Sequence, residues 1–363
     1  MKILIIANND IGLYKFRREL IERLLETHEV HICLPNGEYV KELVKLGCVY
    51  HACEFDRHGT NPFTEVKLVA HYKKLVRMIA PGIVFTYTVK PNIYAGIACA
   101  SLNIPYVANI TGLGTAIENG GVMQKILLPL CKIGLRKAQK VFFQNEENRD
   151  FMLSKGVIKG EYDLLPGSGV NLREYKTSEY PSDETVRFAF ISRIMKEKGI
   201  DQYLDAAEYI RAKYPDTEFH VCGFCEQAYE ERLRELHNKG IIHYHGMIRD
   251  VKAFLKEIHC TIHPTYYPEG LSNVLLESCA SARPIITTNR SGCREVVDDA
   301  VNGYVVREKD SDDLIEKVEK FLLLSYEQKK DMGLRGREKV EREFDRNIVV
   351  EKYLKEISNC GRV

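Results

Sequence analysis

The sequence predicts an α/β protein built from two doubly wound, Rossmann-like domains. Short runs of β-branched and other apolar residues alternate with longer amphipathic stretches along all 363 residues, which is typical of parallel strands covered by helices. That length suits two domains, at roughly 150 residues or more for each. The alternation begins again after a polar stretch at residues 163–184, so we place the domain boundary near Pro166.

Ten strands are expected, five in each half of the chain. Those of the first half are Ile3–Ala7, Glu29–Leu34, Ile83–Thr86, Tyr106–Ile110 and Lys140–Gln144. Those of the second half are Val186–Ile191, Glu218–Cys222, Ile242–Tyr244, Thr261–His263 and Pro284–Thr287. We therefore expect domains at residues 1–166 and 167–347, followed by a segment at 348–363 whose helix returns to the first domain. Because such sheets bind ligands beyond the carboxyl ends of their strands, we expect the site in a cleft where the domains face each other.

The composition excludes several classes of protein. Hydrophobic residues make up 45% and charged residues 28% of the chain, as in globular proteins and unlike disordered or collagenous ones. A formal net charge of +1 argues against a nucleic-acid partner bound through bulk positive charge. The 11 Cys are scattered, mostly in apolar runs, which favours buried thiols in a reducing compartment. Without an apolar segment long enough for a signal peptide or a membrane span, a cytoplasmic location is expected.

The segment Pro268–Glu277 is the most informative motif. No Gly-x-Gly-x-x-Gly follows either first strand and no Gly-Lys-Ser/Thr occurs, which argues against a dinucleotide oxidoreductase and a P-loop ATPase. Here a turn with Gly runs into an apolar helix that is expected to start near Ser272. The N–H groups at a helix start are unpaired and suit a diphosphate. They would come from Gly270, Leu271, Ser272 and Asn273.

Two carboxylates flank this helix start. Glu269 would lie beside the anion, and Glu277, five residues beyond Ser272, would lie roughly 7.5 Å further along the helix, within reach of sugar hydroxyls. The alternative needs no ligand: Glu269 and Ser272 cap the first helical turn, and Glu277 is solvated.

A second motif, Ile191–Gly199, follows the first strand of the second half. Arg193 and Lys198 flank its strand-to-helix loop, where two cations can neutralise the charge that develops on a departing diphosphate. The alternative is an ordinary solvated loop.

Three further patterns are interpreted without a ligand. Asp310-Ser311-Asp312 has the form of a metal-binding Asp-x-Asp, but it opens a helix and suits an N-cap. Cys222 and Cys225 have redox spacing but no second pair for zinc, so we interpret them as incidental. Four histidines are interpreted as packing or loop residues: His243, His245, His259 and His263.

Together the two motifs resemble the glycosyltransferases of family 4, which have the GT-B fold, and the resemblance covers nearly the whole chain. That family carries an Arg and a Lys five residues apart, matched by Arg193 and Lys198, and a Glu-x7-Glu element, matched by Glu269 and Glu277. Ser192 stands where the family usually has Gly. The His that many members carry is missing from Thr111–Gly114, which we assign to the acceptor side.

The resemblance implies transfer of a sugar from a UDP-sugar with retention of configuration and without a metal ion or other cofactor. Arg193, Lys198 and the helix-start amides would stabilise the leaving group. Glu269 would contact the sugar, and Glu277 would bind the ribose hydroxyls. Gly12 and Gly223 would correspond to glycine loops of the family, Gly12 near the donor phosphates. The backbone at Gly246, Met247 and Ile248 would hold the base.

Local charge points to an anionic membrane surface as a partner. Between Val66 and Asn145 there are ten Lys and Arg but one acid, Glu118. Segment 125–140 combines five bases with Leu and Ile and no acid, as expected of a helix that lies on a bilayer. The alternative is a core helix with a basic outer face. Residues 86–94 and 111–114 resemble the bacterial members of the family that extend a saccharide on polyprenyl diphosphate. Membrane docking would suit such a lipid-linked acceptor.

We therefore expect a cytoplasmic enzyme on the inner face of the membrane. It would transfer a hexose or N-acetylhexosamine to a lipid-linked saccharide in the synthesis of a bacterial surface polysaccharide or glycan. Two alternatives remain open at this point: a GT-B sugar-nucleotide 2-epimerase, and a non-catalytic partner that binds sugar nucleotides.

Overall fold

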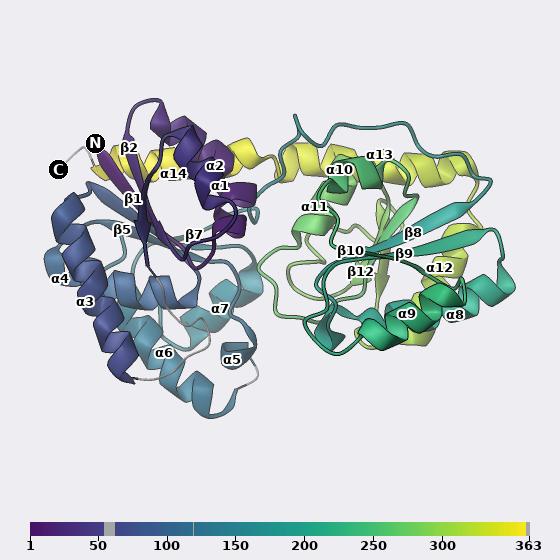
Figure 1. The fold of residues 1–363 in the computed structure, drawn as a ribbon, viewed down its shortest axis with the longest axis horizontal. Coiled ribbons are helices and arrows are strands. Elements are labelled where there is room, and N and C mark those ends of the chain that lie inside the picture. Colours follow the sequence, from purple (N-terminus) through teal and green to yellow (C-terminus); the bar gives the residue numbers. More distant parts are fainter. Residues whose placement is uncertain (54–61, 119, 361–363) are drawn as a thin grey trace. The chain divides into compact units, whose positions relative to one another are not determined.

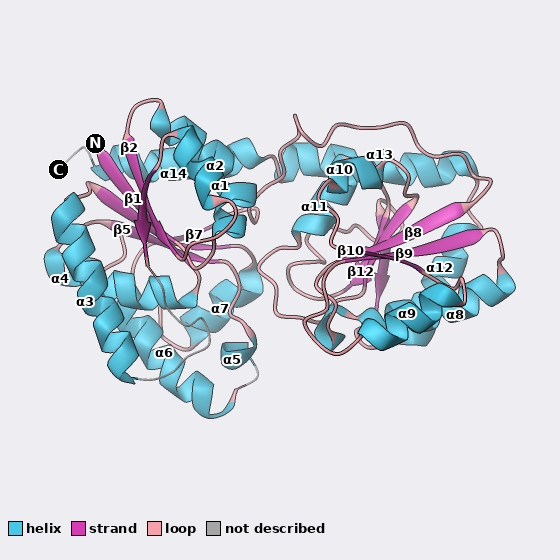
Figure 2. Ribbon diagram, in the orientation of Figure 1, coloured by secondary structure: helices cyan, strands magenta, loops and turns pink. Residues whose placement is uncertain are grey.

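The computed structural model describes residues 1–53, 62–118 and 120–360. The chain divides into two compact units, Met1–Ser168 with Arg346–Val363 and Gly169–Asp345. Each unit is a parallel β-sheet with helices packed on it (Figures 1 and 2).

Unit 1 contains a sheet in the order β3-β2-β1-β4-β5-β6-β7. Every strand pair in it is parallel. Its strands are β1 (Lys2–Ile6), β2 (Glu29–Leu34), β3 (Val49–Ala52), β4 (Ile83–Tyr87), β5 (Tyr106–Ile110), β6 (Lys140–Phe143) and β7 (Tyr162–Leu164). Its helices are α1 (Asp10–Leu25), α2 (Val40–Leu46), α3 (Pro62–Ile79), the π-helix η1 (Pro91–Ala95), α4 (Gly96–Leu102), α5 (Thr115–Glu118), α6 (Gly121–Leu135), α7 (Glu146–Ser154) and α14 (Arg346–Cys360).

Unit 2 contains a parallel sheet in the order β10-β9-β8-β11-β12-β13. Its strands are β8 (Val186–Ile191), β9 (Thr217–Cys222), β10 (His243–Gly246), β11 (Cys260–His263), β12 (Ile285–Thr288) and β13 (Gly303–Val306). Its helices are the 3-10 helix η2 (Lys196–Lys198), α8 (Ile200–Lys213), α9 (Glu230–Asn238), α10 (Val251–Leu255), α11 (Asn273–Ala280), α12 (Ser311–Leu322) and α13 (Tyr326–Glu343).

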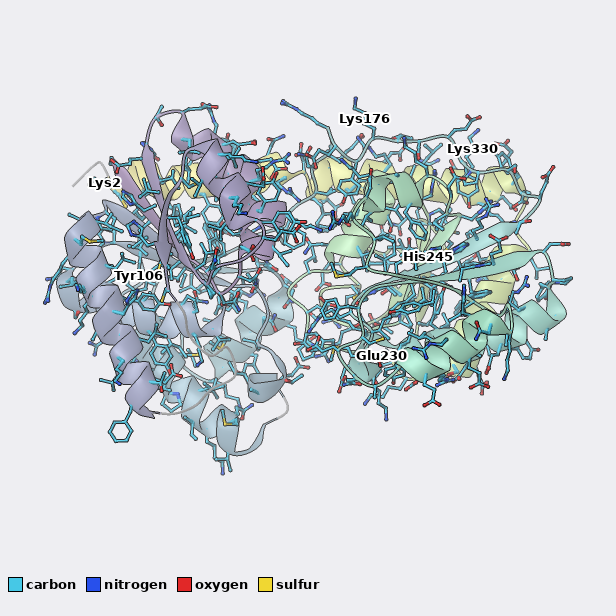
Figure 3. The ribbon with its side chains drawn as sticks, viewed as in Figure 1. Lys2, Tyr106, Lys176, Glu230, His245 and Lys330 are labelled. Carbon is cyan, nitrogen blue, oxygen red and sulfur yellow. The ribbon has the colours of Figure 1, made fainter. Side chains whose placement is uncertain are left out.

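The central strands are buried on both faces, which explains their continuous apolar sequences. All residues of β4, β5 and β11 are buried, because helices cover both sides of a parallel sheet. Figure 3 marks one such residue, Tyr106, whose hydroxyl donates to the Gly134 carbonyl at 2.6 Å.

The C-terminal helix α14 packs within unit 1. The Tyr353 ring on α14 contacts Phe85 and Phe142 at centroid distances of 5.1 and 5.2 Å. At the start of the helix, Arg346 pairs with Glu19 at 2.8 Å. The last segment of the chain therefore forms part of the first unit's core.

The strands that the sequence analysis missed are β3, β7 and β13, and all three lie at sheet edges. Two of them, β3 and β7, have exposed or half-buried residues at every position. An edge strand is covered less than a central one, so its sequence need not be a continuous apolar run. Within the described residues, no helix combines the length and apolar character needed to cross a bilayer.

Candidate active site

The predicted donor residues gather at the carboxyl edge of the unit 2 sheet. The sheet extends from β8 in both directions, to β9 on one side and to β11 on the other. Such a switch in strand order opens a crevice where the loops after the two neighbouring strands diverge. The loop after β8 carries Arg193 and Lys198, and the loop after β11 carries Glu269. The fold thus brings the two sequence motifs together.

The two loops are joined through their backbones. The Tyr266 N–H donates to the Glu197 carbonyl at 2.9 Å. Gly199 has φ +78°, and a Cβ atom there would stand 2.1 Å from the Pro264 carbonyl oxygen. Only glycine therefore permits this approach of the loops, which sets the position of the adjacent Lys198.

Lys198 and Glu269 form an ion pair in this crevice. Their side chains are 8% and 15% exposed, respectively. The His263 ring, at the end of β11, places Nε2 3.5 Å from the same carboxylate oxygen. Burial alone would favour the neutral acid, but the Lys198 ammonium and the His263 ring outweigh it and hold the pKa of Glu269 well below its usual range. Burial lowers the pKa of His263 despite its carboxylate neighbour. The site therefore holds a carboxylate, an ammonium and a neutral imidazole.

Arg193 and Lys198 both contact the ring of Tyr267. The Arg193 guanidinium is 5.1 Å from the centre of the Tyr267 ring, and the Lys198 ammonium is 4.7 Å from it. Arg193 also bonds to Glu226 at 2.5 Å and keeps 34% of its side chain exposed. The ring holds two cations close together, an arrangement suited to an anionic ligand.

The helix start at Ser272 agrees with the sequence prediction, but fewer amides are available than expected. The helix α11 begins at Asn273 with Ser272 as its N-cap, and within the described residues the Ser272 side chain makes no capping bond. The Ser272 N–H donates to the Gly292 carbonyl at 2.8 Å, so it does not serve an anion. Leu271 is buried, whereas Asn273 and Glu277 are half-buried.

The ligand-free interpretation gives Glu269 and Ser272 capping roles at this helix start. Glu269 pairs with Lys198, and Ser272 is the N-cap but makes no side-chain capping bond within the described part of the chain.

The residues expected to hold the base lie further along the same edge. Gly223, after β9, donates its N–H to the Gly246 carbonyl at 2.8 Å. A Cβ atom at Gly223 would meet the Ser192 carbonyl oxygen at 1.7 Å, with φ at +147°, so the backbone requires glycine. Beyond Gly246, Met247 is 67% exposed and Ile248 is half-buried.

Gly12 lies in a helix and not in the expected loop, and its place near the donor phosphates stays a prediction. It lies in the first turn of α1, and its N–H donates to the Asn9 side chain at 2.5 Å. The expectation of a loop fails because Asn9 is a good N-cap and starts the helix directly after β1.

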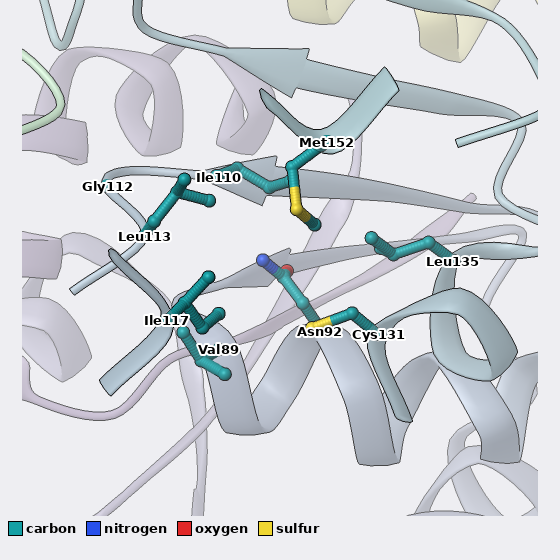
Figure 4. Close-up of a pocket in the computed structure, with 9 residues that line it drawn as sticks. All are labelled: Val89, Asn92, Ile110, Gly112, Leu113, Ile117, Cys131, Leu135 and Met152. Atoms are coloured by element: carbon teal, nitrogen blue, oxygen red, sulfur yellow. The ribbon is translucent and has the colours of Figure 1, made fainter. Parts of the chain in front are cut away.

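On the acceptor side, the Thr111–Gly114 loop borders a small apolar pocket of unit 1 (Figure 4). The pocket lies at the carboxyl ends of β4 and β5. It is lined by Val89, Asn92, Ile110, Gly112, Leu113, Ile117, Cys131, Leu135 and Met152. Its polar residue, Asn92, is already bonded to Thr86 and to the Asn109 carbonyl, at 2.7 and 2.8 Å. The pocket therefore suits an apolar group.

The three patterns that were interpreted without a ligand have the following surroundings and contacts within the protein. Asp310 is the N-cap of α12 and accepts from the Asp313 N–H. Cys222 and Cys225 are free thiols. His259 is buried, accepting from the Arg187 N–H at 3.0 Å and contacting the Ser182 carbonyl at 2.9 Å. His220 stacks with the other two histidines of that region, His243 and His245.

Sequence reasoning missed Tyr267, Glu226 and Gly292, and it interpreted His263 as packing. The available signal for His263 and Tyr267 was their position at and just after the carboxyl end of a buried strand. Glu226 and Gly292 contact the site from other loops, and no local pattern marks such residues.

Comparison with known proteins agrees with this arrangement. The family described as glycosyl transferases group 1 matches residues 173–339, and the family described as glycosyl transferase 4-like matches residues 2–145. The N,N'-diacetylbacillosaminyl-diphospho-undecaprenol alpha-1,3-N-acetylgalactosaminyltransferase of Campylobacter jejuni is 25% identical over 373 residues, covering 98% of each chain. The capsular polysaccharide biosynthesis glycosyltransferase CapM of Staphylococcus aureus is 23% identical, covering 96% of this chain and 94% of its own.

Solved structures share the fold at low sequence identity. A glycosyltransferase from Rickettsia africae aligns with a TM-score of 0.83 at 18% identity, covering 99% of this chain and 98% of its own. HepE of Anabaena, crystallised in complex with UDP, has a TM-score of 0.81 at 16% identity, covering 99% and 100%. The chain thus has the architecture of a two-domain sugar transferase. It belongs to the GT4-type glycosyltransferases of the GT-B fold, which confirms the predicted family, fold class and enzyme class.

Proposed function

We propose that this glycosyltransferase moves a hexose or N-acetylhexosamine from a UDP-sugar to a saccharide carried on polyprenyl diphosphate, in the synthesis of a bacterial surface glycan. The transfer retains the anomeric configuration and needs no metal ion. The observation that carries the proposal is the convergence of Arg193, Lys198 and Glu269 at the switch point of the unit 2 sheet.

The charges of this site suit a departing nucleoside diphosphate. Breaking the bond between the sugar and the diphosphate leaves negative charge on a phosphate oxygen, and the Lys198 ammonium and Arg193 guanidinium are placed to stabilise it. Glu269 is ionised and its pKa is low, so it is not a proton donor. Its carboxylate instead suits sugar hydroxyls and the positive charge of an oxocarbenium-like sugar. The acceptor oxygen forms the new bond, and its proton goes to the departing phosphate.

The lipid-linked acceptor is supported by the name of one full-length relative, the surface glycan by that of a second, and membrane docking by the surface of α6. The name of the Campylobacter relative specifies a diphospho-undecaprenol acceptor, and that of the Staphylococcus relative specifies capsular polysaccharide. The apolar pocket beside Thr111–Gly114 would accept a group as small as an acyl methyl.

The outward face of α6 is both apolar and basic. Val122, Ile126 and Ile133 are 73%, 50% and 52% exposed, at spacings that place them on one side of a helix. Pro129 is also exposed and lies between them. The exposed bases of the helix and its end are Lys125, Lys132, Arg136 and Lys137. A core helix with a merely basic outer face would not expose these large apolar residues, so we infer that α6 lies on an anionic bilayer.

The activity is tested with purified protein, labelled UDP-sugars and an undecaprenyl diphosphate-linked saccharide. Transfer of label to the lipid fraction supports the proposal. Release of a free epimerised sugar would instead indicate a 2-epimerase, and donor binding without turnover would indicate a non-catalytic partner. Transfer that stops with EDTA and returns with Mg²⁺ or Mn²⁺, but not with Zn²⁺, would overturn the metal-free mechanism.

Membrane docking is tested separately by sedimentation with vesicles that contain anionic lipid. Lys132→Glu with Arg136→Glu should reduce binding, and added salt should reduce binding of the wild type. Arg234→Glu with Lys252→Glu is the matched control, because it makes the same charge change at exposed bases of unit 2. Equal binding by both double variants, or binding that salt does not change, would refute a role for α6.

A further inference from the structure

Cysteine and histidine side chains meet on one face of unit 1, at the edge formed by β2 and β3. Cys33 lies in β2, and Cys53 directly follows β3. Cys33 is paired in register with His51, and because alternate residues of a strand share a face, Cys53 projects to the same side as Cys33. The helix α3 packs on this face and brings His71 to the two thiols.

The spacing of the group suits a single shared metal ion. One ligand atom each from Cys33, Cys53 and His71 lies within 4.8 Å of the other two. Both cysteines are buried, at 0% and 4% exposure, and His71 is exposed. Ligands about 2.0 to 2.3 Å from a common Zn²⁺ ion are separated by distances inside this limit.

A neighbouring hydroxyl supplies a second, independent observation. Tyr72 is completely buried beside the cysteines, and within the described residues its hydroxyl has no hydrogen bond of ordinary geometry. It lies near enough to Cys53 to interact with that sulfur. A hydroxyl in this position can donate to a metal-bound thiolate, which is the usual role of groups surrounding a metal's direct ligands.

We propose that Cys33, Cys53 and His71 bind one Zn²⁺ ion that ties α3 to the β2–β3 edge, with a water molecule as fourth ligand. Thiolate and imidazole favour zinc over magnesium or calcium, which prefer oxygen. Two thiolates and a neutral imidazole also cancel the charge of the ion, which matters for a group that is mostly buried. The two thiol protons are released to solvent when the ion binds.

The ion would be structural and takes no part in sugar transfer. Its ligands belong to unit 1, whereas the proposed donor residues belong to unit 2. The inference therefore does not depend on the proposed function, and a metal-free transfer reaction is compatible with it.

The test uses the full chain, stripped of metal and kept reduced, and titrated with Co²⁺. Binding at this site should give the thiolate-to-cobalt charge-transfer band and the visible bands of tetrahedral cobalt, saturating at one equivalent and abolished by one equivalent of Zn²⁺. Cys33→Ser and Cys53→Ser should each weaken the affinity for Zn²⁺ by at least 100-fold. His71→Gln changes an exposed residue and tests the third ligand without disturbing the core.

Two further variants separate a metal site from a general effect of losing a thiol. Cys48→Ser removes another buried free cysteine of unit 1 and should leave the cobalt spectrum unchanged. Tyr72→Phe should keep the spectrum and weaken Zn²⁺ binding on the order of 10-fold. A wild-type protein without the charge-transfer band would overturn the proposal. So would a band that survives both cysteine substitutions.

Discussion

Replacing Lys198 by Met should change how stability depends on pH. Met keeps most of the apolar stem of Lys but removes the ammonium that holds Glu269 ionised. In the wild type the pKa of Glu269 is depressed, so its contribution to stability is present above the unfolded value of 4.5 and is lost only as the pH falls through the folded pKa. Without the ammonium, burial dominates and favours a bound proton, on Glu269 or on the neighbouring His263.

The size of the effect follows from the burial of the pair. Removing one partner of a buried ion pair costs about 3–5 kcal/mol, and both side chains here are at most 15% exposed. Proton uptake relieves part of this cost in the Lys198→Met variant. Over the pH range in which the folded variant keeps this proton and the unfolded chain has lost it, the folded state holds up to one proton more. As the pH rises, the free energy of unfolding of the variant should therefore fall, relative to that of the wild type, by up to about 1.4 kcal/mol per pH unit.

The assay is urea unfolding at several pH values, monitored by circular dichroism. The double variant Lys198→Met/Glu269→Gln should lose this pH dependence and recover part of the stability. Lys339→Met is the matched control, since Lys339 is also buried but its partner Asp298 is 49% exposed and stays hydrated. A Lys198→Met variant with the wild-type pH profile would refute the coupling. Turnover of Lys198→Ala should fall by on the order of 10²-fold, because the charge acts on the leaving group.

Three further predictions concern the same unit. Glu277→Ala should weaken UDP binding by about 1–3 kcal/mol in calorimetry, and an unchanged affinity would remove Glu277 from the ribose site. Burial lowers the pKa of His259 to about 4, so the folded state prefers the neutral ring. The free energy of unfolding should therefore fall as the pH is lowered from 6.5 to 4. His259→Gln should flatten that part of the stability profile, while a profile identical to that of the wild type would contradict the assignment. Gly199→Ala should lower stability by about 2 kcal/mol or more and reduce turnover, because its Cβ atom meets the Pro264 carbonyl at positive φ; a melting temperature equal to that of the wild type would disprove the close approach.

The sequence by itself determined the class of fold and most of the central strands. Strands such as β4, β5 and β11 are covered by helices on both faces, so each must be apolar throughout, and that requirement is visible in the residues alone. The donor motifs were visible for a related reason: each lies within one loop and its adjoining helix, so the spacing of its residues is local.

The tertiary structure decided the edge strands and the contacts between residues that are distant in the sequence. Edge strands such as β3 are partly exposed, so their residues lack a continuous apolar run. The ion pair of Lys198 and Glu269 joins residues 71 positions apart, and it exists because β8 and β11 are neighbours in the sheet. Which amides of the α11 start remain available depends on the Gly292 carbonyl, which arrives from yet another loop. Contacts between distant segments depend on strand order and packing, and no short stretch of sequence specifies them.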